Sequence, residues 1–406
     1  MAKLGQTTTV PEAPDAPAWA AIVSLALGVF ALVSAEFLPA AVLTPMAADL
    51  RVSVGAAGQA VTATAVVGAF AALFGPIVTR SLDRRTVLWL LIALLCVSNL
   101  MTAFAADLPM LLTARVLLGV ALGGFWSMAA AVAMRLVSLE RLPRAMAIVF
   151  TGVSLATVLA APLGAYVGDL WGWRAAFLLA GAVGGVALAG VTFTIPRLPP
   201  VGASGLGNLF AVARRPSILI ALAAVVLAVS GHFAGFTYIR PVLEQVTRLD
   251  AGAISLVFLL FGLAGFAGNF LGGRFAARDP KRAVIGGTAL MAVSALALSV
   301  FAASPWLAGL AFAAWGMAFT MLPIGFQSWV TSEAVDHAEL AGGLLTATFQ
   351  VAIATGAIGG GLLVDQLGPT AAPAYCAVAT AVGLALVGSR WAAVRRRPDP
   401  CICPAE

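Results

Sequence analysis

The stretch WAAIVSLALGVFALVSAEFLPAAVL, residues 19–43, decides the fold class of this chain. It has 25 residues, and Glu36 is the single charged one. A membrane-spanning helix needs ~20 consecutive apolar residues, whereas the core of a signal peptide is shorter. The preceding residues 1–17 are polar, with Lys3 as their single basic residue, which is a poor start for a signal peptide. The stretch therefore predicts a helix that stays in the membrane.

Eleven further stretches of this kind follow along the chain. The twelve expected spans are 18–43, 56–79, 86–106, 108–134, 145–168, 173–195, 217–239, 252–275, 283–303, 305–331, 340–364 and 371–392. Hydrophobic residues make up 61% of the chain and charged residues 10%, against roughly 25% charged residues in a soluble domain. A soluble protein of this composition lacks the polar groups to cover its surface, so lipid must be its main solvent. We expect an all-α membrane protein with twelve transmembrane helices.

The longest interior connection, residues 196–216, separates two groups of six spans. We therefore expect an N-terminal tail 1–17, a bundle 18–195, a central loop 196–216, a second bundle 217–392 and a C-terminal tail 393–406. The halves look like copies of each other. Gly75 and Arg84–Arg85 match Gly272 and Lys281–Arg282 at an offset of 197, and Asp169-Leu-Trp-Gly172 matches Asp365-Gln-Leu-Gly368 at 196. Parallel repeats of this kind place a substrate site near the bilayer midplane, between the halves.

The placement of Lys and Arg predicts the orientation. With the N-terminus inside, 18 of the 23 basic residues lie on the cytoplasmic side, four lie outside and Arg115 lies within a span. Cytoplasmic loops carry the excess of basic residues, so we expect both termini in the cytoplasm. One cytoplasmic loop, 332–339, departs from this pattern because it is acidic and has no Lys or Arg. The net charge of +6 is spread between the spans, so no nucleic-acid partner is expected.

Three motifs resemble those of the major facilitator superfamily. The loop Gly75-Pro-Ile-Val-Thr-Arg80-Ser-Leu-Asp83-Arg84-Arg85 is similar to the family's G-x-x-x-D-R-x-G-R-R, with Thr79 in place of Asp and Leu82 in place of Gly. The fourth span has Arg115-x-x-x-Gly119, and the fifth ends its motif with Ala161-Pro162-Leu163-Gly164. The resemblance implies the major facilitator fold of two pseudo-symmetric six-helix bundles. It also implies that Arg80, Asp83, Arg84 and Arg85 brace the closed cytoplasmic face, although these arginines can equally be topology signals.

Other strings are similar to those of bacterial purine ribonucleoside efflux pumps in the drug/proton antiporter branch. They are Glu36-Phe-Leu-Pro39, Leu43-Thr-Pro45-Met46, Ala121-Leu-Gly123-Gly124-Phe125-Trp126 and Phe236-Thr-Tyr238-Ile-Arg240-Pro241. This likeness implies a monomeric inner-membrane transporter that exports purine ribonucleosides such as inosine and guanosine in exchange for protons, without a cofactor. A multidrug or sugar exporter of the same superfamily is the alternative, and uptake by symport also stays open.

Glu36 and Arg115 are the first candidates for proton coupling. Each charge within a span costs at least ~2.5 kcal/mol at the helix centre, so it needs a functional reason. Glu36 lies seven residues before the outer end of its span and Arg115 lies seven residues into a span of opposite direction, so both lie roughly 10 Å deep. The resemblance adds that both spans line the central cavity. We therefore expect Glu36 to carry the proton with Arg115 as its partner. A permanent structural ion pair and direct substrate binding by Glu36 are the alternatives.

His232 is the third candidate for proton coupling. It follows Glu36 by 196 residues, so the two occupy equivalent positions in the two halves. A second alignment, which pairs Pro39 with Pro241, places Tyr238 there instead. Histidine has a pKa near neutrality and relays protons or hydrogen-bonds a purine. The alternative is a neutral histidine bonded within its own bundle.

Aromatic and amide side chains within the spans are the candidates for substrate binding. They are Trp126, Phe236, Trp315, Phe319 and Gln350. Trp315 and Phe319 are four residues apart, so they share one helix face on which a flat base can stack. The alternative is that these rings contact lipid or neighbouring helices. One acidic residue and one histidine in the spans do not make a catalytic or metal-ligand set, and no phosphate-binding loop is present, so neither an enzyme nor a metal site is expected.

Overall fold

The computed structural model describes residues 18–138, 141–200, 213–334 and 338–395. The expected tail 1–17, most of the expected tail 393–406 and residues 201–212 of the expected central loop lie outside the described residues. Every secondary-structure element in the described ranges is helical. The all-α prediction is confirmed.

Among the described residues, the first half of the chain forms seven helices. They are α1 (Trp19–Ala41), α2 (Leu43–Leu50), α3 (Val54–Val78), α4 (Arg84–Ala103), α5 (Leu108–Leu136), α6 (Leu142–Trp171) and α7 (Trp173–Thr194). The second half contains α9 (Pro216–Thr237), α10 (Ile239–Pro241), η3 (Val242–Val246), α11 (Ala251–Arg278), α12 (Pro280–Phe301), α13 (Pro305–Glu333), α14 (Ala338–Leu367) and α15 (Ala371–Arg395). Within the described residues, twelve helices are long and apolar enough to span a membrane, as predicted.

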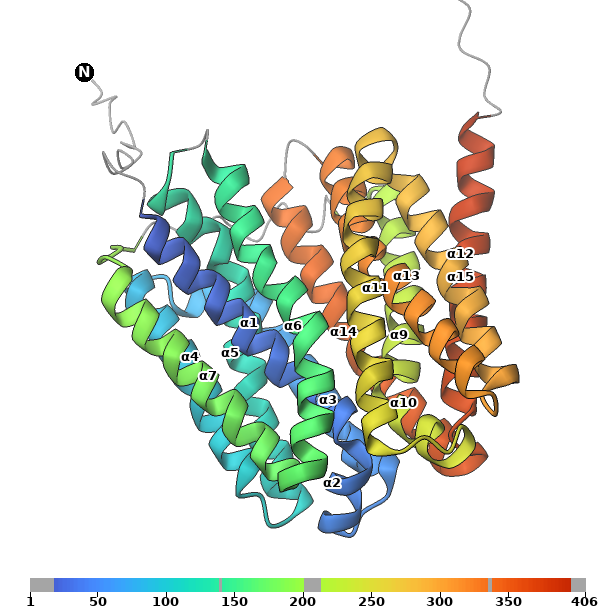
Figure 1. The fold of residues 1–406 in the computed structure, drawn as a ribbon. Helices are drawn as coiled ribbons and strands as arrows, with labels where there is room; N and C mark the ends of the chain where they lie inside the picture. The colour runs from blue at the N-terminus through green and yellow to red at the C-terminus, as the bar shows by residue number, and fades with distance from the viewer. Residues whose placement is uncertain (1–17, 139–140, 201–212, 335–337, 396–406) are drawn as a thin grey trace, which may run out of the picture.

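The helices stand side by side in two bundles, α1–α7 and α9–α15 (Figure 1). Successive long helices alternate in direction, so the connections gather at two ends of the molecule. We call the end with the starts of α1, α4 and α12 the proximal face, and the end with α2, α10 and η3 the distal face. In Figure 1 the proximal face is at the top and the distal face is at the bottom.

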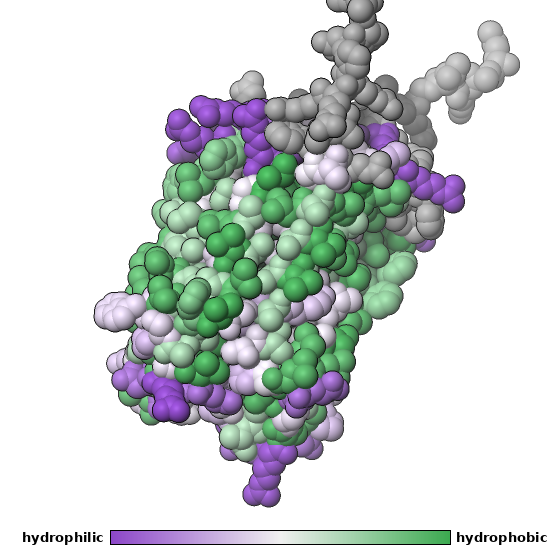
Figure 2. Space-filling view, turned by 90° about the vertical axis from the view of Figure 1, so that its right-hand side faces the viewer, coloured by the Kyte–Doolittle hydropathy of each residue, from purple (hydrophilic) through white to green (hydrophobic). Residues whose placement is uncertain are grey.

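Apolar side chains cover the middle of the molecule and hydrophilic ones gather at its two ends (Figure 2). Large apolar side chains lie fully on this surface, and Phe193, Trp306 and Leu310 are 86%, 89% and 69% exposed. Exposure of such a surface to water costs about 25 cal/mol per Å² of apolar area, whereas lipid tails solvate it. The fold is therefore that of a multi-pass membrane protein.

The two bundles repeat each other in the way that their helices begin and end. Gly172 and Gly368, 196 residues apart, have φ values of 85° and 90°, a conformation that glycine adopts at low cost. Asp83 and Asp279, also 196 apart, cap α4 and α12 by accepting bonds from the backbone N–H of Arg85 and Lys281. These caps align Arg85 with Lys281, one residue away from the pairing predicted from the sequence. The helix caps therefore determine how the two halves align at this loop, and the similarity of the basic side chains does not.

Two helix pairs make the most extensive contacts between the bundles: α14 packs against α3, and α11 packs against α6. The second contact depends on Gly262 of α11. A Cβ at this position would lie 2.5 Å from Cα of Val158 and 2.7 Å from the carbonyl oxygen of Thr157 on α6. Small residues let membrane helices approach backbone to backbone. Gly262 therefore permits the close packing of α11 against α6 at the interface between bundles.

Candidate functional site

Arg115 lies on α5 and is 1% exposed. Its Nη1 donates to the carbonyl oxygen of Ala35 on α1 at 3.1 Å, and its Nη2 donates to Oγ1 of Thr102 at 3.1 Å. The guanidinium carbon also lies 4.6 Å from the centre of the Phe177 ring, within range of a cation–π contact. The depth predicted for Arg115 is therefore correct, because it contacts α1 one residue before Glu36.

The acceptor that Arg115 uses follows from a proline in α1. Pro39 lies inside this helix and has no N–H. The carbonyl four residues earlier, that of Ala35, consequently has no partner within the helix backbone. An unpaired carbonyl in a membrane is costly, and the Arg115 guanidinium satisfies it. The string from Glu36 to Pro39 thus places a carboxylate directly beside the carbonyl that binds Arg115.

Glu36 does not form the expected ion pair with Arg115. Among the described residues, no nitrogen of Arg115 lies within 4.0 Å of the Glu36 carboxylate, and that carboxylate accepts no hydrogen bond. Consecutive residues of a helix point about 100° apart, so the carbonyl of Ala35 brings the guanidinium to α1 without directing it at Glu36. Glu36 is partly exposed in the middle of an otherwise buried run. Its carboxylate is available to a proton or a ligand.

Four of the expected site residues form one aromatic cluster in the second bundle. The rings of His232 and Phe319 are stacked with centroids 3.5 Å apart, and Phe236 lies 5.3 Å from His232 on α9. Nε1 of Trp315 donates to Nδ1 of His232 at 2.9 Å. Because Nδ1 accepts this bond, the neutral ring carries its proton on Nε2. We call His232, Phe236, Trp315 and Phe319 the aromatic cluster.

The aromatic cluster reaches the first bundle beside Glu36. The rings of Phe37 on α1 and Phe236 on α9 meet edge to face with centroids 5.6 Å apart. His232 is 1% exposed and Trp315 is fully buried, whereas Phe319 is partly exposed. The cluster is therefore a packed wall between the bundles with one accessible ring.

The two remaining substrate candidates, Trp126 and Gln350, do not belong to this cluster. Trp126 on α5 packs against Phe150 of α6, with centroids 5.9 Å apart, and is partly exposed. Gln350 on α14 is 5% exposed and lies against Gly68 of α3, where a Cβ would be 2.6 Å from its Nε2. No hydrogen bond of the Gln350 amide is found among the described residues. Gln350 thus offers free donors at the contact between bundles.

Three of the four expected gate residues at the proximal face bond within the first bundle. Arg84 donates to the hydroxyl and carbonyl oxygens of Thr79 at 3.0 and 3.1 Å. Nη2 of Arg85 donates to the carbonyl oxygen of Thr192 on α7 at 2.6 Å, and Asp83 caps α4. Arg80 is exposed. Thr79 therefore binds Arg84 where the family has an aspartate, and among the described residues none of these side chains reaches the second bundle.

Most polar bonds between the bundles lie instead at the distal face, on residues that the sequence did not assign to a site; nearer the middle of the molecule, the amide of Asn269 on α11 donates to the hydroxyl of Ser154 on α6 at 3.1 Å. Arg240 of α10 is 3% exposed; it donates to the carboxylate of Asp169 on α6 at 2.7 Å and to the carbonyl oxygen of Ala41 on α1. Its Nε also donates to Glu244 at 2.6 Å. Nothing in the sequence around Arg240 identifies Asp169 as its partner.

In a second distal connection the acid belongs to the second bundle and its partners belong to the first. The carboxylate of Asp365 on α14 accepts from the Ser53 hydroxyl at 2.6 Å and from the Gly55 N–H at 3.0 Å. The hydroxyl of Tyr238 donates to the carbonyl oxygen of Ala357 at 2.8 Å and lies 3.4 Å from that of Gly55. We call Arg240, Asp169, Asp365, Ser53 and Tyr238 the distal lock. The repeated spacing of Asp169-x-x-Gly and Asp365-x-x-Gly was the available signal for its two acids.

A sequence model of the Major Facilitator Superfamily matches residues 24–343 and 249–401. The chain belongs to the Major Facilitator Superfamily. It is 40% identical over 352 residues to proteins named purine ribonucleoside efflux pump NepI from Salmonella paratyphi B, Salmonella enteritidis and Salmonella typhimurium, a match that covers 87% of this chain and 89% of each relative.

A solved structure shares the fold of this Major Facilitator Superfamily member. It is described as a bacterial homologue of the human lysosomal transporter Spinster in an inward-facing and occupied conformation. The TM-score is 0.72 at 15% sequence identity, and the match covers 94% of this chain and 98% of that one. The predicted fold of two pseudo-symmetric six-helix bundles is confirmed. The relatives are transporters, which agrees with the expectation that the chain is not an enzyme.

Proposed function

We propose that this chain exports purine ribonucleosides, such as inosine, guanosine and their analogues, in exchange for protons. The observation that carries this proposal is the 40% identity, over 87% of the chain, to pumps named for purine ribonucleoside efflux. The strings around Glu36, Trp126 and Phe236 lie within the residues that match the Major Facilitator Superfamily. The proposed partners are a nucleoside, protons and the bilayer, and the proposed active form is a monomer without a cofactor.

The proposed substrate site lies between the aromatic cluster and the first bundle. A purine is flat, and stacking of a base on an aromatic ring contributes about 1–3 kcal/mol. Phe319 and Trp126 are the partly exposed rings of the candidate set. The Nε2–H of His232 and the unpartnered amide of Gln350 supply donors for ring nitrogens and carbonyl oxygens of the base. A sugar alone would need several hydroxyl-binding groups, which this set does not contain.

The proposed proton carrier is Glu36. Its carboxylate has no hydrogen-bond partner among the described residues, although it lies within a membrane-spanning helix. Uptake of a proton neutralises this charge, and its release restores a negative charge beside Arg115 and Phe37. Exchange follows if the nucleoside and the proton stabilise opposite forms of this region, because each ligand then displaces the other. Arg115 would hold α1 in place through Ala35, and His232 would relay the proton or bind the base.

The distal lock defines the conformational state in this proposal. Since the bundles are bonded at the distal face, we propose that this face is periplasmic and closed, and that the proximal face is cytoplasmic and open. Both termini would then lie in the cytoplasm and the chain in the inner membrane. The units 18–195 and 217–392 would rock about their contact, with Arg80, Asp83, Arg84 and Arg85 closing the proximal face in the other state.

Inverted membrane vesicles test the exchange directly. With an acidic lumen, vesicles that contain the protein should accumulate radiolabelled inosine, and collapse of the pH gradient should abolish the accumulation. Glu36→Gln should still bind inosine but lose accumulation driven by the gradient. Asp107→Asn, an acid-to-amide change in an exposed helix cap, is the matched control and should transport normally. Accumulation that ignores the gradient would rule out proton exchange; transport of sugars or unrelated drugs without nucleosides would rule out the substrate class.

A further inference from the structure

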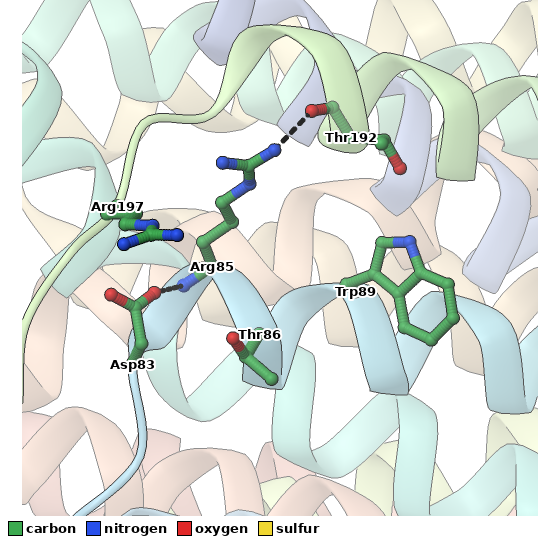
Figure 3. A pocket seen from close by; sticks show the side chains of 6 residues that line it. All are labelled: Asp83, Arg85, Thr86, Trp89, Thr192 and Arg197. Atoms are coloured by element: carbon green, nitrogen blue, oxygen red, sulfur yellow. Dashed lines mark hydrogen bonds between the residues drawn. The ribbon is translucent and has the colours of Figure 1, made fainter.

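A hollow outside the candidate transport site lies at the proximal face of the first bundle. It has a volume of about 540 Å³ and is lined by Asp83, Arg85, Thr86, Trp89, Thr192 and Arg197 (Figure 3). Its walls are the start of α4, the end of α7 and the segment after α7. These two helices pack mainly against α1, α5, α6 and each other. The hollow therefore opens on the outer side of the bundle, away from the second bundle.

The charges in this hollow favour an anion. Arg85 uses one N–H of its guanidinium for the Thr192 carbonyl, which leaves further donors free. Arg197 lies beside it (Figure 3) and forms no ion pair within 4.0 Å among the described residues. Asp83 is the single acid of the lining, and one of its oxygens already caps α4. Two guanidinium groups against one carboxylate leave a net positive charge, and guanidinium geometry matches phosphate oxygens.

The surroundings of the hollow distinguish a lipid from a free phosphate. Trp89 follows Arg85 by one helical turn and is 41% exposed, in the position of an interfacial anchor. Beyond the arginines, Leu90 and Phe193 are 43% and 86% exposed. A lipid with its phosphate at Arg85 and Arg197 would thus have the Trp89 ring beside its glycerol. The apolar side chains beyond the arginines would lie along its acyl chains.

We propose that this hollow binds the headgroup phosphate of an anionic phospholipid. Arg85 and Arg197 would hold the phosphate oxygens, Thr86 would donate a hydroxyl, and Trp89 would cover the glycerol region. The inference requires a membrane-embedded chain but does not depend on which solute the chain carries. Its failure would therefore leave the proposed nucleoside export untouched, and a failure of export would not affect it.

Lipid retention by the purified full-length chain tests the site. Native mass spectrometry should show phosphatidylglycerol bound in preference to phosphatidylcholine. Arg197→Gln and Trp89→Ala should each lower the phosphatidylglycerol affinity, with about a fivefold loss for the removed charge. Arg141→Gln removes an exposed charge from the same face outside the hollow and is the matched control. Size-exclusion profiles and circular dichroism verify that each variant is folded.

Three results would overturn the proposal. Equal losses for Arg197→Gln and Arg141→Gln would mean that the surface charge acts without a defined site. Equal retention of phosphatidylcholine would exclude selection of an anionic headgroup. Displacement of the lipid by millimolar inorganic phosphate would show a small-anion site that does not need the acyl chains. Loss of phosphatidylglycerol in Arg197→Gln and Trp89→Ala but not in Arg141→Gln, with both other tests negative, supports it.

Discussion

The distal and proximal faces differ in where their charged side chains reach. At the distal face, Arg240 and Asp365 bond to residues of the opposite bundle. At the proximal face, Arg84, Arg85 and Lys281 bond to residues of their own bundle. Among the described residues, the charged side chains that bond across the bundles lie at the distal face, and the bond from Asn269 to Ser154 is the polar bond between bundles nearest the proximal face. Side chains of the same kind hold the bundles together at one face and stiffen each bundle separately at the other.

This difference separates the bonds that stabilise the fold from the bonds that favour one conformational state of the transporter. A bond within a bundle is present whichever way the transporter opens, so it stabilises the fold equally in both states. A bond between bundles exists in one state alone, and it shifts the equilibrium by its full differential energy. Variants of the distal lock should consequently change conformation, whereas variants of proximal and within-bundle pairs should change stability.

Arg240→Ala should have the largest effect. The Arg240 side chain is 4% exposed and bonds to Asp169, Glu244 and Ala41, and loss of one partner from a buried pair costs about 3–5 kcal/mol. We expect the closed distal face to lose about 100-fold or more in relative population. A cysteine placed at buried Ala57, in a background without native cysteines, should then react with an impermeant maleimide from the distal side.

Arg174→Ala is the matched control for this variant. Arg174 also lies at the distal face, but its carboxylate partner Asp49 belongs to the same bundle. Its removal should leave labelling at Ala57 unchanged. If both arginine variants expose Ala57 equally, the distal contact stabilises the fold in general and does not report the state.

Asp365→Ala should have the next largest effect. It removes the acceptor for the Ser53 hydroxyl and the Gly55 N–H, and bonds to a charged group contribute about 1.5–3 kcal/mol. Spin labels at Ala56 and Leu367 should show a larger fraction of long distances. Asp250→Ala removes a cap of α11 at the same face; it should lower the melting temperature but keep the distance distribution. An unchanged distribution in Asp365→Ala would remove this residue from the lock.

Tyr238→Phe should have a smaller effect of the same kind. The buried hydroxyl lies 3.4 Å from the carbonyl oxygen of Gly55 on α3 of the opposite bundle, a neutral bond that contributes up to about 1 kcal/mol. Amide hydrogen exchange at the start of α3 should be about fivefold faster as the closed state becomes less populated. Equal exchange rates in wild type and variant would show that the ring alone, and not its hydroxyl, holds this position.

Asp49→Asn should have the smallest effect and should act on stability alone. The Arg174 guanidinium holds the pKa of the Asp49 carboxyl below its usual value of 3.8. A carboxyl with a lowered pKa stabilises the fold above its ordinary value and loses that contribution as the pH falls through the lowered one. Both side chains are more than a third exposed, so we expect at most ~0.5 kcal/mol. The difference in melting temperature from wild type should be present at pH 7 and should shrink as the pH falls below 3.8 and through the lowered pKa of Asp49.

The sequence predicted the spans because a bilayer tolerates few alternatives. A run such as 19–43 must cross the membrane as a helix, and its length sets its ends. Counting residues along α1 and α5 also placed Glu36 and Arg115 at one depth, and the structure brings Arg115 to Ala35. Depth depends on rise per residue alone, which is nearly constant in helices.

What the sequence did not predict depends on rotation about the helix axes and on contacts across the bundles. The direct pair of Glu36 and Arg115 was expected, but the carbonyl freed by Pro39 binds the guanidinium instead. That acceptor can be derived from the sequence by counting four residues back from the proline. The partners of Arg240 and Asp365 belong to the opposite half of the chain, and no local pattern names them. The joining of His232 with Phe319 likewise required the arrangement of α9 against α13.

Asp169 and Asp365 stand at equivalent positions near the ends of α6 and α14, each three residues before a glycine of positive φ. Each extends to the half that it does not belong to. This reciprocity is the signature of an isologous interface, in which one surface patch meets its own copy across a two-fold axis. A six-helix chain with one such aspartate would dimerise through two equal contacts. Once two copies are joined in a single chain, each contact can diverge alone, here into an ion pair on one side and a hydroxyl with a backbone amide on the other.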